Sequence, residues 1–274
     1  MNMEINLVEL KTKNKKKKSI KLKPIYSPLA LEREYKKFIN RLINSLFIEL
    51  GKGLEGKQLH INYNEIIDMI DSLNGSFDLG LIKDKVTDLF DNVNKRNKKK
   101  IVSSVLDGTG VNVGNFLIIY NEEIQSVLEK IVAQNVLLIK SIGDDSLKDV
   151  KRIITDGHLQ GSTINEIKKL IFPLVKKDND LASTRRKARQ RAETIAITET
   201  AKANSTLTQK RFKELEINKV IWSSARDKRT RRCHMARHGS VYDIDKGCWS
   251  SCDNKTIQTG YEVRCRCAML GVVE

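Results

Sequence analysis

The residues best suited to chemistry lie near the end of the chain, where all five cysteines and two of the four histidines follow residue 232. Structural zinc sites use four Cys or His ligands, usually two close pairs that the fold brings together. The candidates here are Cys233, His234, His238, Cys248, Cys252, Cys265 and Cys267. The sequence therefore predicts a structural zinc site. Because it offers seven candidate residues for four ligand positions, it does not identify which four bind the metal. The alternative is a set of buried, inert thiols with a surface pair of histidines.

Enzymatic chemistry is less well supported in the same region. Cys233 and His234 are adjacent in the sequence, whereas a nucleophile and its base must face each other in space. Asp227, Asp243 and Asp245 could join His234 in a nuclease-type metal site, but surface loops commonly carry such acids. The sequence also has no Walker motif and no Gly-x-Gly-x-x-Gly after a strand. We therefore predict that the chain is not an enzyme.

The net charge of +16 is unevenly distributed. Residues 1–23 hold eight lysines against two glutamates, and residues 183–232 hold fifteen Lys and Arg against five acids, which accounts for the whole excess. Such clusters attract double-stranded DNA without sequence preference, although a solvated helix face is the alternative. The tentative DNA-binding residues are Lys15, Lys16, Lys17, Lys18, Arg185, Arg186, Lys187 and Arg189.

The chain carries no sign of secretion or of membrane insertion. It has no run of about 18 apolar residues, and its first lysine run follows the short apolar stretch instead of preceding it. We therefore expect a protein made in the reducing host cytoplasm, with no membrane partner. An odd number of clustered cysteines in that compartment argues against a disulfide framework.

The elements that must position these residues are mainly helical. Apolar residues recur at helical spacing, and this periodicity changes to a strand pattern at Val220–Trp222. The fold class is therefore mainly α, with a helical N-terminal body and a small α+β Cys/His-rich C-terminal module. We predict an extended basic arm over 1–28, the helical body over 29–216 and the module over 217–274. The helices are expected near 31–50, 63–73, 79–93, 121–140, 144–155, 163–175 and 183–215.

Three segments carry a family resemblance: 191–212 (RAETIAITETAKANSTLTQKRF), 220–245 (VIWSSARDKRTRRCHMARHGSVYDID) and 263–270 (VRCRCAML). They resemble the phage Mu F-like minor head proteins, also called phage head morphogenesis proteins. Residues 24–42 and 135–167 are also similar to the family's helical regions. The residues that match in order are Arg191, Ala192, Ile195, Ala196, Thr198, Glu199, Trp222, Asp227, Arg229, Thr230, His234, Gly239, Cys265, Arg266 and Cys267.

This resemblance implies a virion component carried in few copies in the head near the portal, without catalysis. It implies binding to the portal protein, with scaffold or major capsid protein as further partners, and roles in head assembly and DNA packaging or ejection. The second hypothesis is a zinc-containing nucleic-acid-binding protein, which would need sequence-specific binding. The third is a metal-dependent nuclease or other effector, which would need turnover that is lost on changing Asp227 or His234.

The sequence departs from the family pattern at the presumed metal positions. Many members have Cys-x-x-Cys after the Asp, where this chain has Arg231 and His234, and Glu262 stands where a His often precedes Cys-Arg-Cys. Ile197 also replaces the family's usual Arg. We hypothesise that Cys248 and Cys252 replace the lost ligands.

Overall fold

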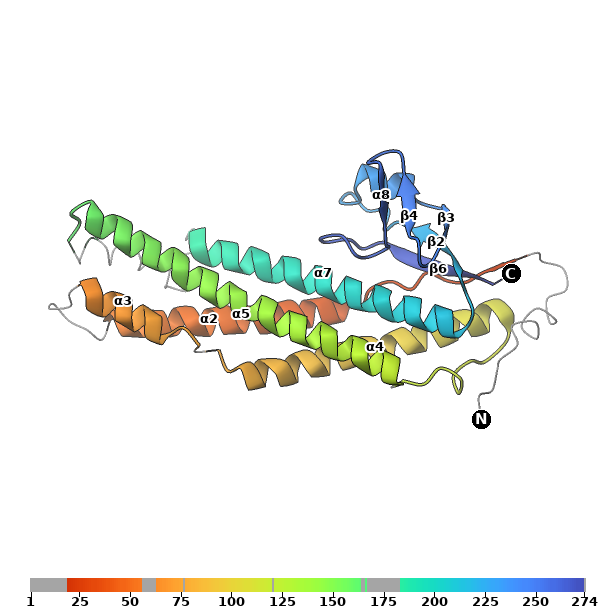
Figure 1. Ribbon diagram of the computed structural model, residues 1–274, viewed down its shortest axis with the longest axis horizontal. Helices are drawn as coiled ribbons and strands as arrows, with labels where there is room; N and C mark the ends of the chain where they lie inside the picture. The colour runs from red at the N-terminus through yellow and green to blue at the C-terminus, as the bar shows by residue number, and fades with distance from the viewer. Residues whose placement is uncertain are drawn as a thin grey trace. The chain divides into compact units, whose positions relative to one another are not determined.

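The computed structural model of the chain describes residues 19–55, 63–75, 77–119, 121–163, 166 and 183–273 (Figure 1). Long helices make up most of this part of the chain, and a small sheet is formed largely by its C-terminal region. The predicted fold class, mainly α with an α+β C-terminal module, is therefore confirmed. Lys15–Lys18 and most of the helix expected over 163–175 lie outside the described residues.

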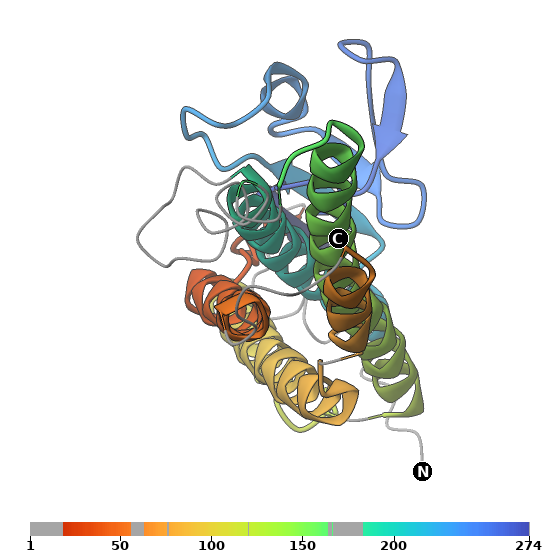
Figure 2. The same ribbon diagram turned by 90° about the vertical axis from the view of Figure 1, so that its left-hand side faces the viewer.

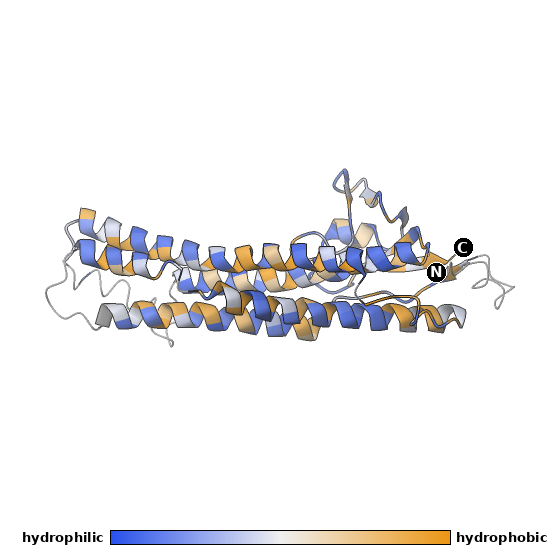
Figure 3. Cartoon of the chain, turned by 60° about the horizontal axis from the view of Figure 1, so that its bottom comes forward, coloured by the Kyte–Doolittle hydropathy of each residue, from blue (hydrophilic) through white to orange (hydrophobic). Residues whose placement is uncertain are grey.

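Long amphipathic helices supply most of the fold. Each carries apolar and polar bands along its length, as the hydropathy colouring in Figure 3 shows. In α2, α3, α4 and α5 the buried residues recur mostly every three or four positions, which places them on one helix face, whereas α7 is buried on all sides over residues 195–201. The bounds are α2 (Leu29–Glu55), α3 (Tyr63–Ser72), α4 (Leu79–Thr109), α5 (Glu122–Leu159) and α7 (Ser183–Glu214).

Two of these helices are longer than the sequence predicts. Helix α4, expected near 79–93, continues through the basic stretch 95–100 because Asn97, Ile101 and Val105 extend its buried face. Helix α5 is one element where two helices were expected. Gly143 lies buried in the middle of α5, where an added Cβ would stand 2.6 Å from the ring of Phe77. The glycine therefore permits close packing and does not end the helix.

An antiparallel four-stranded sheet has the order β1-β6-β2-β3, with β2 and β6 at its centre (Figure 1). The strands are β1 (Ile20–Lys21), β2 (Lys219–Ser223), β3 (Val241–Asp243) and β6 (Ala268–Val273). A separate hairpin joins β4 (Cys248–Ser250) to β5 (Lys255–Ile257), and the short helix α8 (Arg232–Ala236) precedes β3. Figure 2 shows the C-terminal segment that carries this hairpin in blue.

The residues that precede α2 belong to this sheet. Ile20 pairs with Val273, and the Leu22 amide donates a hydrogen bond to the Gly271 carbonyl. Leu22 and Ile25 are buried in a core that also contains Trp222 and Cys265. Residues 19–28 are thus extended, and they are held by strand pairing and apolar burial.

The contacts divide the chain into two compact units. Unit 1 contains the residues up to Glu32, Thr87–Val132 and the residues from Ile197 onward, and unit 2 contains Arg33–Val86 and Ala133–Ala196. Helices α2, α4, α5 and α7 each contribute residues to both units. The three-part division into arm, body and module remains a prediction.

Within the described ranges, no helix is both long and apolar enough to cross a lipid bilayer.

Candidate metal centre

Three of the seven predicted ligands come together in unit 1. His234 lies in α8, and Cys265 and Cys267 lie just before β6. The Nδ1 atom of His234 is 3.5 Å from the Sγ atom of Cys265 and 3.5 Å from that of Cys267. All three side chains are buried. Two thiols and one imidazole nitrogen at this separation provide three of the four ligands of a tetrahedral metal site.

The backbone before β6 presents both sulfur atoms to the histidine. Arg264 has a φ of 56°, in the left-handed region, and the Cys265 amide donates to the Glu262 carbonyl to close a turn. The Arg264 amide donates to the hydroxyl of Thr198 on α7 at 3.0 Å. Thr198, selected above only by family resemblance, thus braces the loop that carries Cys265 and Cys267.

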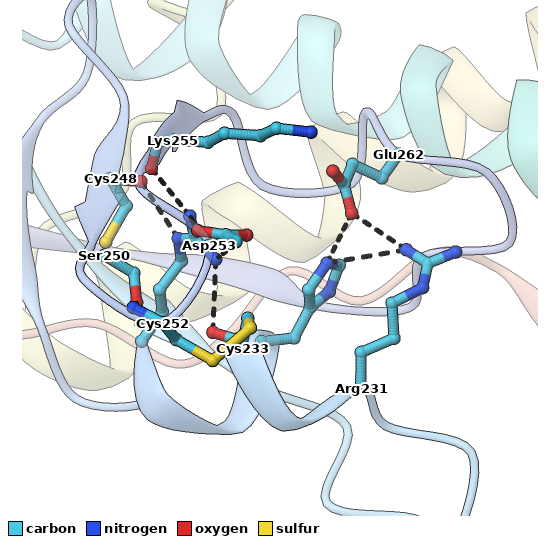
Figure 4. Close-up of a disulfide and its surroundings, with 10 residues drawn as sticks. Arg231, Cys233, Cys248, Ser250, Cys252, Asp253, Lys255 and Glu262 are labelled. Atoms are coloured by element: carbon cyan, nitrogen blue, oxygen red, sulfur yellow. Dashed lines mark hydrogen bonds and ion pairs between the residues drawn. A yellow bond between two sulfur atoms is a disulfide. The ribbon is translucent and has the colours of Figure 1, made fainter.

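The second nitrogen of His234 is held by a carboxylate. Its Nε2 lies 2.6 Å from Oε2 of Glu262. Arg231 completes a three-residue network, because it is 2.9 Å from the same oxygen and donates to the Val263 carbonyl at 2.6 Å (Figure 4). A carboxylate on Nε2 fixes the imidazole with Nδ1 toward the sulfur atoms, which is the usual arrangement behind a metal-bound histidine. The sequence showed Glu262 and Arg231 as departures only, although their opposite charges are consistent with this pairing.

Hydrogen bonds among the three side chains shift their pKa values. The pKa of Cys265 is lowered to about 4, chiefly by the hydrogen bond from Cys267 and also by His234. The hydrogen bond with Cys265 raises the pKa of His234. The hydrogen bond between Cys265 and Cys267, together with burial, raises the pKa of Cys267. These directions favour a thiolate at Cys265 and a thiol at Cys267.

Two other candidate ligands are joined in a disulfide. Cys233 of α8 is bonded to Cys252 in the turn between β4 and β5, with a Cα–Cα distance of 5.3 Å (Figure 4). The odd number of cysteines had predicted no disulfide framework, and that expectation is wrong for Cys233 and Cys252. The number of cysteines cannot reveal this bond, because the bond depends on the packing of α8 against the β4–β5 hairpin. Cys248 is a buried free thiol, and burial raises its pKa. The hypothesis that Cys248 and Cys252 act together as replacement ligands therefore does not fit this geometry.

A buried arginine holds the hairpin against α8. The side chain of Arg237 has no exposed surface, and it donates to the carbonyl oxygens of Cys248, Cys233 and Lys255. It also forms a two-pronged ion pair with Asp253, at 2.7 and 3.1 Å, and this hydrogen bonding keeps the pKa of Asp253 below its usual value. The sequence did not indicate a role for Arg237, since nothing in its surroundings shows that this arginine is buried.

The remaining predicted residues of this region have their own partners. Nδ1 of His238 accepts the Ser224 amide at 3.1 Å, and its Nε2 contacts Arg226. His238 does not belong to the ligand group of His234 among the described residues. The carboxylate of Asp227 accepts the Thr230 hydroxyl and the Arg229 amide, which closes the loop before α8.

The other family-motif residues take structural positions. Gly239 has a φ of 83°, and Glu199 of α7 is buried beside Lys202. Trp222 is fully buried and packs edge-on against His234, with ring centroids 5.6 Å apart. Among the described residues, the acids of the suggested nuclease-type site do not form a ligand cluster with His234.

A cavity of about 330 Å³ lies directly beside the three candidate ligands. His234, Cys265 and Cys267 contribute to its wall, together with the loop of Asp227 and Thr230. Four arginines also line it: Arg229, Arg231, Arg264 and Arg266. Three of them form ion pairs with acids: Arg229 with Asp227, Arg231 with Glu262, and Arg266 with Glu32. The cavity therefore has candidate metal ligands on one part of its wall and arginine side chains on another.

The basic segment of α7 in unit 2 is only partly available to DNA. Arg185 is buried, and it donates to Oδ1 of Asn44 at 2.9 Å. Arg189 is half-buried near the same oxygen, whereas Arg186 and Lys187 are exposed.

These features define a mainly helical protein whose C-terminal residues enclose a candidate Cys/His metal centre. Residues 148–270 match the family model of phage Mu protein F like proteins. This segment contains the whole centre, and the match confirms the resemblance predicted from the sequence motifs. The chain is also similar to an uncharacterized protein of Haemophilus influenzae, with 23% identity over 287 aligned positions. That alignment covers 99% of the chain but only 60% of the relative's length. No solved structure matches the chain.

Proposed function

We propose that the chain is a minor head protein of a tailed bacteriophage that acts in head morphogenesis. The observation that carries this proposal is the match of residues 148–270 to phage Mu protein F like proteins. Several motif residues of that segment, namely Thr198, Trp222, Asp227 and the Cys265–Cys267 loop, lie in unit 1, whereas Arg191 and Ala192 lie in unit 2. A head protein needs such a stable module, and it needs no substrate turnover.

The roles of the motif residues support a non-enzymatic function. Thr198 braces a loop, Asp227 closes a turn and Trp222 fills the core, so each has a structural task in place of a reacting partner. Side chains with these roles stabilise a docking module. We therefore propose that the module is an assembly element, with the portal protein as its main partner and scaffold or major capsid protein as further partners.

The basic residues support a position close to packaged DNA. Exposed Arg186 and Lys187 can contact phosphates, and Lys15–Lys18 add positive charge at the start of the chain. Contacts of this kind are non-specific and weaken steeply as salt rises. The proposed location is the head near the portal, after synthesis in the host cytoplasm, with DNA contact during packaging or ejection.

A pull-down with the portal protein from the same phage tests this function. Tagged full-length chain would be incubated with portal protein, with and without DNA nuclease, at low and moderate salt. Retention after nuclease treatment is expected, because docking is proposed to be direct. A variant with Arg186 and Lys187 changed to Gln should keep portal binding and lose affinity for DNA. Loss of portal after nuclease would contradict direct docking and favour the zinc-containing nucleic-acid-binding alternative.

A further inference from the structure

We propose that His234, Cys265 and Cys267 bind one zinc ion, and that its fourth coordination position opens into the arginine-lined cavity and takes an exchangeable water or small anion. This inference does not rest on the proposed head function. It concerns a site with three protein ligands, in contrast to the closed four-ligand zinc sites that only support a fold.

The distances fit a tetrahedral ion before any metal is added. With Zn–N and Zn–S bonds of about 2.0–2.1 and 2.3 Å, a nitrogen and a sulfur ligand of one tetrahedral zinc lie about 3.6 Å apart. His234 Nδ1 is 3.5 Å from each of the two sulfur atoms. Zinc would replace the shared protons of this cluster and bind both sulfur atoms as thiolates, releasing those protons to solvent.

Groups around the cluster suit a bound metal. Glu262 accepts from Nε2 of His234 and so directs Nδ1 toward the ion. The indole N–H of Trp222 is fully buried and has no hydrogen-bond partner among the described residues. It lies near Cys267, although not in hydrogen-bond geometry. A metal-bound thiolate at Cys267 would give this buried donor an acceptor.

The described residues offer no fourth ligand to this ion. Cys233 and Cys252 are joined to each other, and His238 is held by Ser224 and Arg226. Glu262 contacts the opposite nitrogen of His234, so it stands behind that ligand and not beside the ion. In the part of the chain that the structure describes, the metal-binding group contains His234, Cys265 and Cys267 alone.

The cavity determines what completes the site. All three ligand residues line it, so the open side of the cluster faces its space of about 330 Å³. Two thiolates neutralise the charge of Zn²⁺, and the wall presents four guanidinium groups, three of which also pair with Asp227, Glu262 and Glu32. Guanidinium donors next to a neutral metal centre favour water or a small anion over a cation.

Cobalt substitution of the full chain tests the site, because tetrahedral Co²⁺ bound by thiolates has visible absorption bands that report its ligands. Metal-free protein would be titrated with Co²⁺, and azide would then be added as a probe anion. We expect one Co²⁺ per chain, a thiolate charge-transfer band, and a shift of the visible bands on adding azide. X-ray absorption of the zinc form should show two sulfur and two lighter ligands.

Variants distinguish this site from other thiols. Cys265→Ser should abolish the thiolate–cobalt spectrum, whereas Cys248→Ser, which removes a buried thiol outside the cluster, should leave it unchanged. Glu262→Gln should still bind one Co²⁺ per chain, but its affinity for Co²⁺ should be about 10-fold lower or more. This weakening is expected even though the variant stays folded. Absence of Co²⁺ binding to the wild type, a spectrum insensitive to azide, or an unchanged spectrum in Cys265→Ser would overturn the proposal.

Discussion

The two units of the chain place their charged side chains in different environments. In unit 2, Lys36 pairs with Glu193, Lys187 with Asp149 and Arg191 with Asp145, and these pairs are solvent-accessible. Unit 1 buries the whole guanidinium groups of Arg211 and Arg237 among neutral and charged acceptors, and among the described residues of unit 2 the buried arginine is Arg185, beside Asn44. Exposed pairs contribute little to stability, while a buried polar group is costly when its partner is removed. Substitution of Arg211 or Arg237 should therefore be far more damaging than substitution in one of these solvent-accessible pairs of unit 2.

The polar network around Arg211 shows how unit 1 accommodates a buried charge. Arg211 of α7 donates to the side-chain oxygens of Asn94 and Asn97 on α4. Asn97 in turn donates to Asn204 and Thr208. Burial lowers the pKa of Arg211 to about 10, so the guanidinium still carries its charge at neutral pH. The network links α4 and α7 through hydrogen bonds that apolar side chains could not provide.

The largest expected effect is that of Arg211→Met. The change keeps an apolar stem but leaves two buried amide oxygens without donors, at about 1–3 kcal/mol each, so we expect the free energy of unfolding to fall by about 4 kcal/mol. Urea denaturation followed by circular dichroism measures it. Arg191→Met on the same helix is the matched control in unit 2 and should cost less than about 1 kcal/mol. Equal losses in the two variants would remove the distinction between the units.

The disulfide of unit 1 should have the next largest effect. Its two cysteines are 19 residues apart, and closing a loop of this size stabilises a fold by about 3 kcal/mol in the chain-entropy description. Paired replacement of Cys233 and Cys252 by Ser should lower the free energy of unfolding by up to that amount. Hydrogen exchange should speed up in α8 and the β4–β5 hairpin and stay unchanged in unit 2. Unaltered exchange throughout the hairpin would show that Arg237 alone is sufficient to hold it.

Unit 2 should respond to packing changes more than to changes of charge. In Gly143→Ala the added Cβ would stand 2.6 Å from the ring of Phe77, so the ring or α5 must shift. Overpacking of this kind costs about 1–3 kcal/mol, although alanine itself favours the helix more than glycine does. Thermal unfolding should show a lower midpoint. Restoration by Phe77→Leu in the double variant would assign the loss to this contact, and an unchanged midpoint in Gly143→Ala would argue against tight packing here.

The smallest expected effect is a pH dependence at Asp253. Its pKa lies below the usual value because of the hydrogen bond with Arg237, so the native state favours the ionised form. The resulting stability is present above the unfolded-state pKa and is lost as the pH falls through the lower native value. Stability curves of wild type and Asp253→Asn should therefore converge in acid and separate toward neutral pH. A constant difference between the two curves at all pH values would exclude this linkage.

The sequence predicts unit 2 better than unit 1 because helical periodicity is a local signal. The pattern Leu31 to Leu46 is sufficient to place α2, whereas the strand of Ile20 and Lys21 exists only because β6 offers a partner. The same holds at the metal centre. Sequence motifs indicated His234, Cys265 and Cys267, but the disulfide that removes Cys233 and Cys252 depends on contacts between separate elements. Glu262 was visible only as a departure from a family pattern, and its role requires the position of the imidazole.

The most direct test of the account is to ask whether the chain is a component of the phage head. Heads from the phage that encodes it would be purified as empty proheads and as DNA-filled particles, treated with nuclease and analysed by quantitative mass spectrometry. The account predicts a few copies per particle in both fractions, in a constant ratio to the portal protein. Recovery of the chain only in the free fraction, with none in nuclease-treated heads, would contradict a head protein.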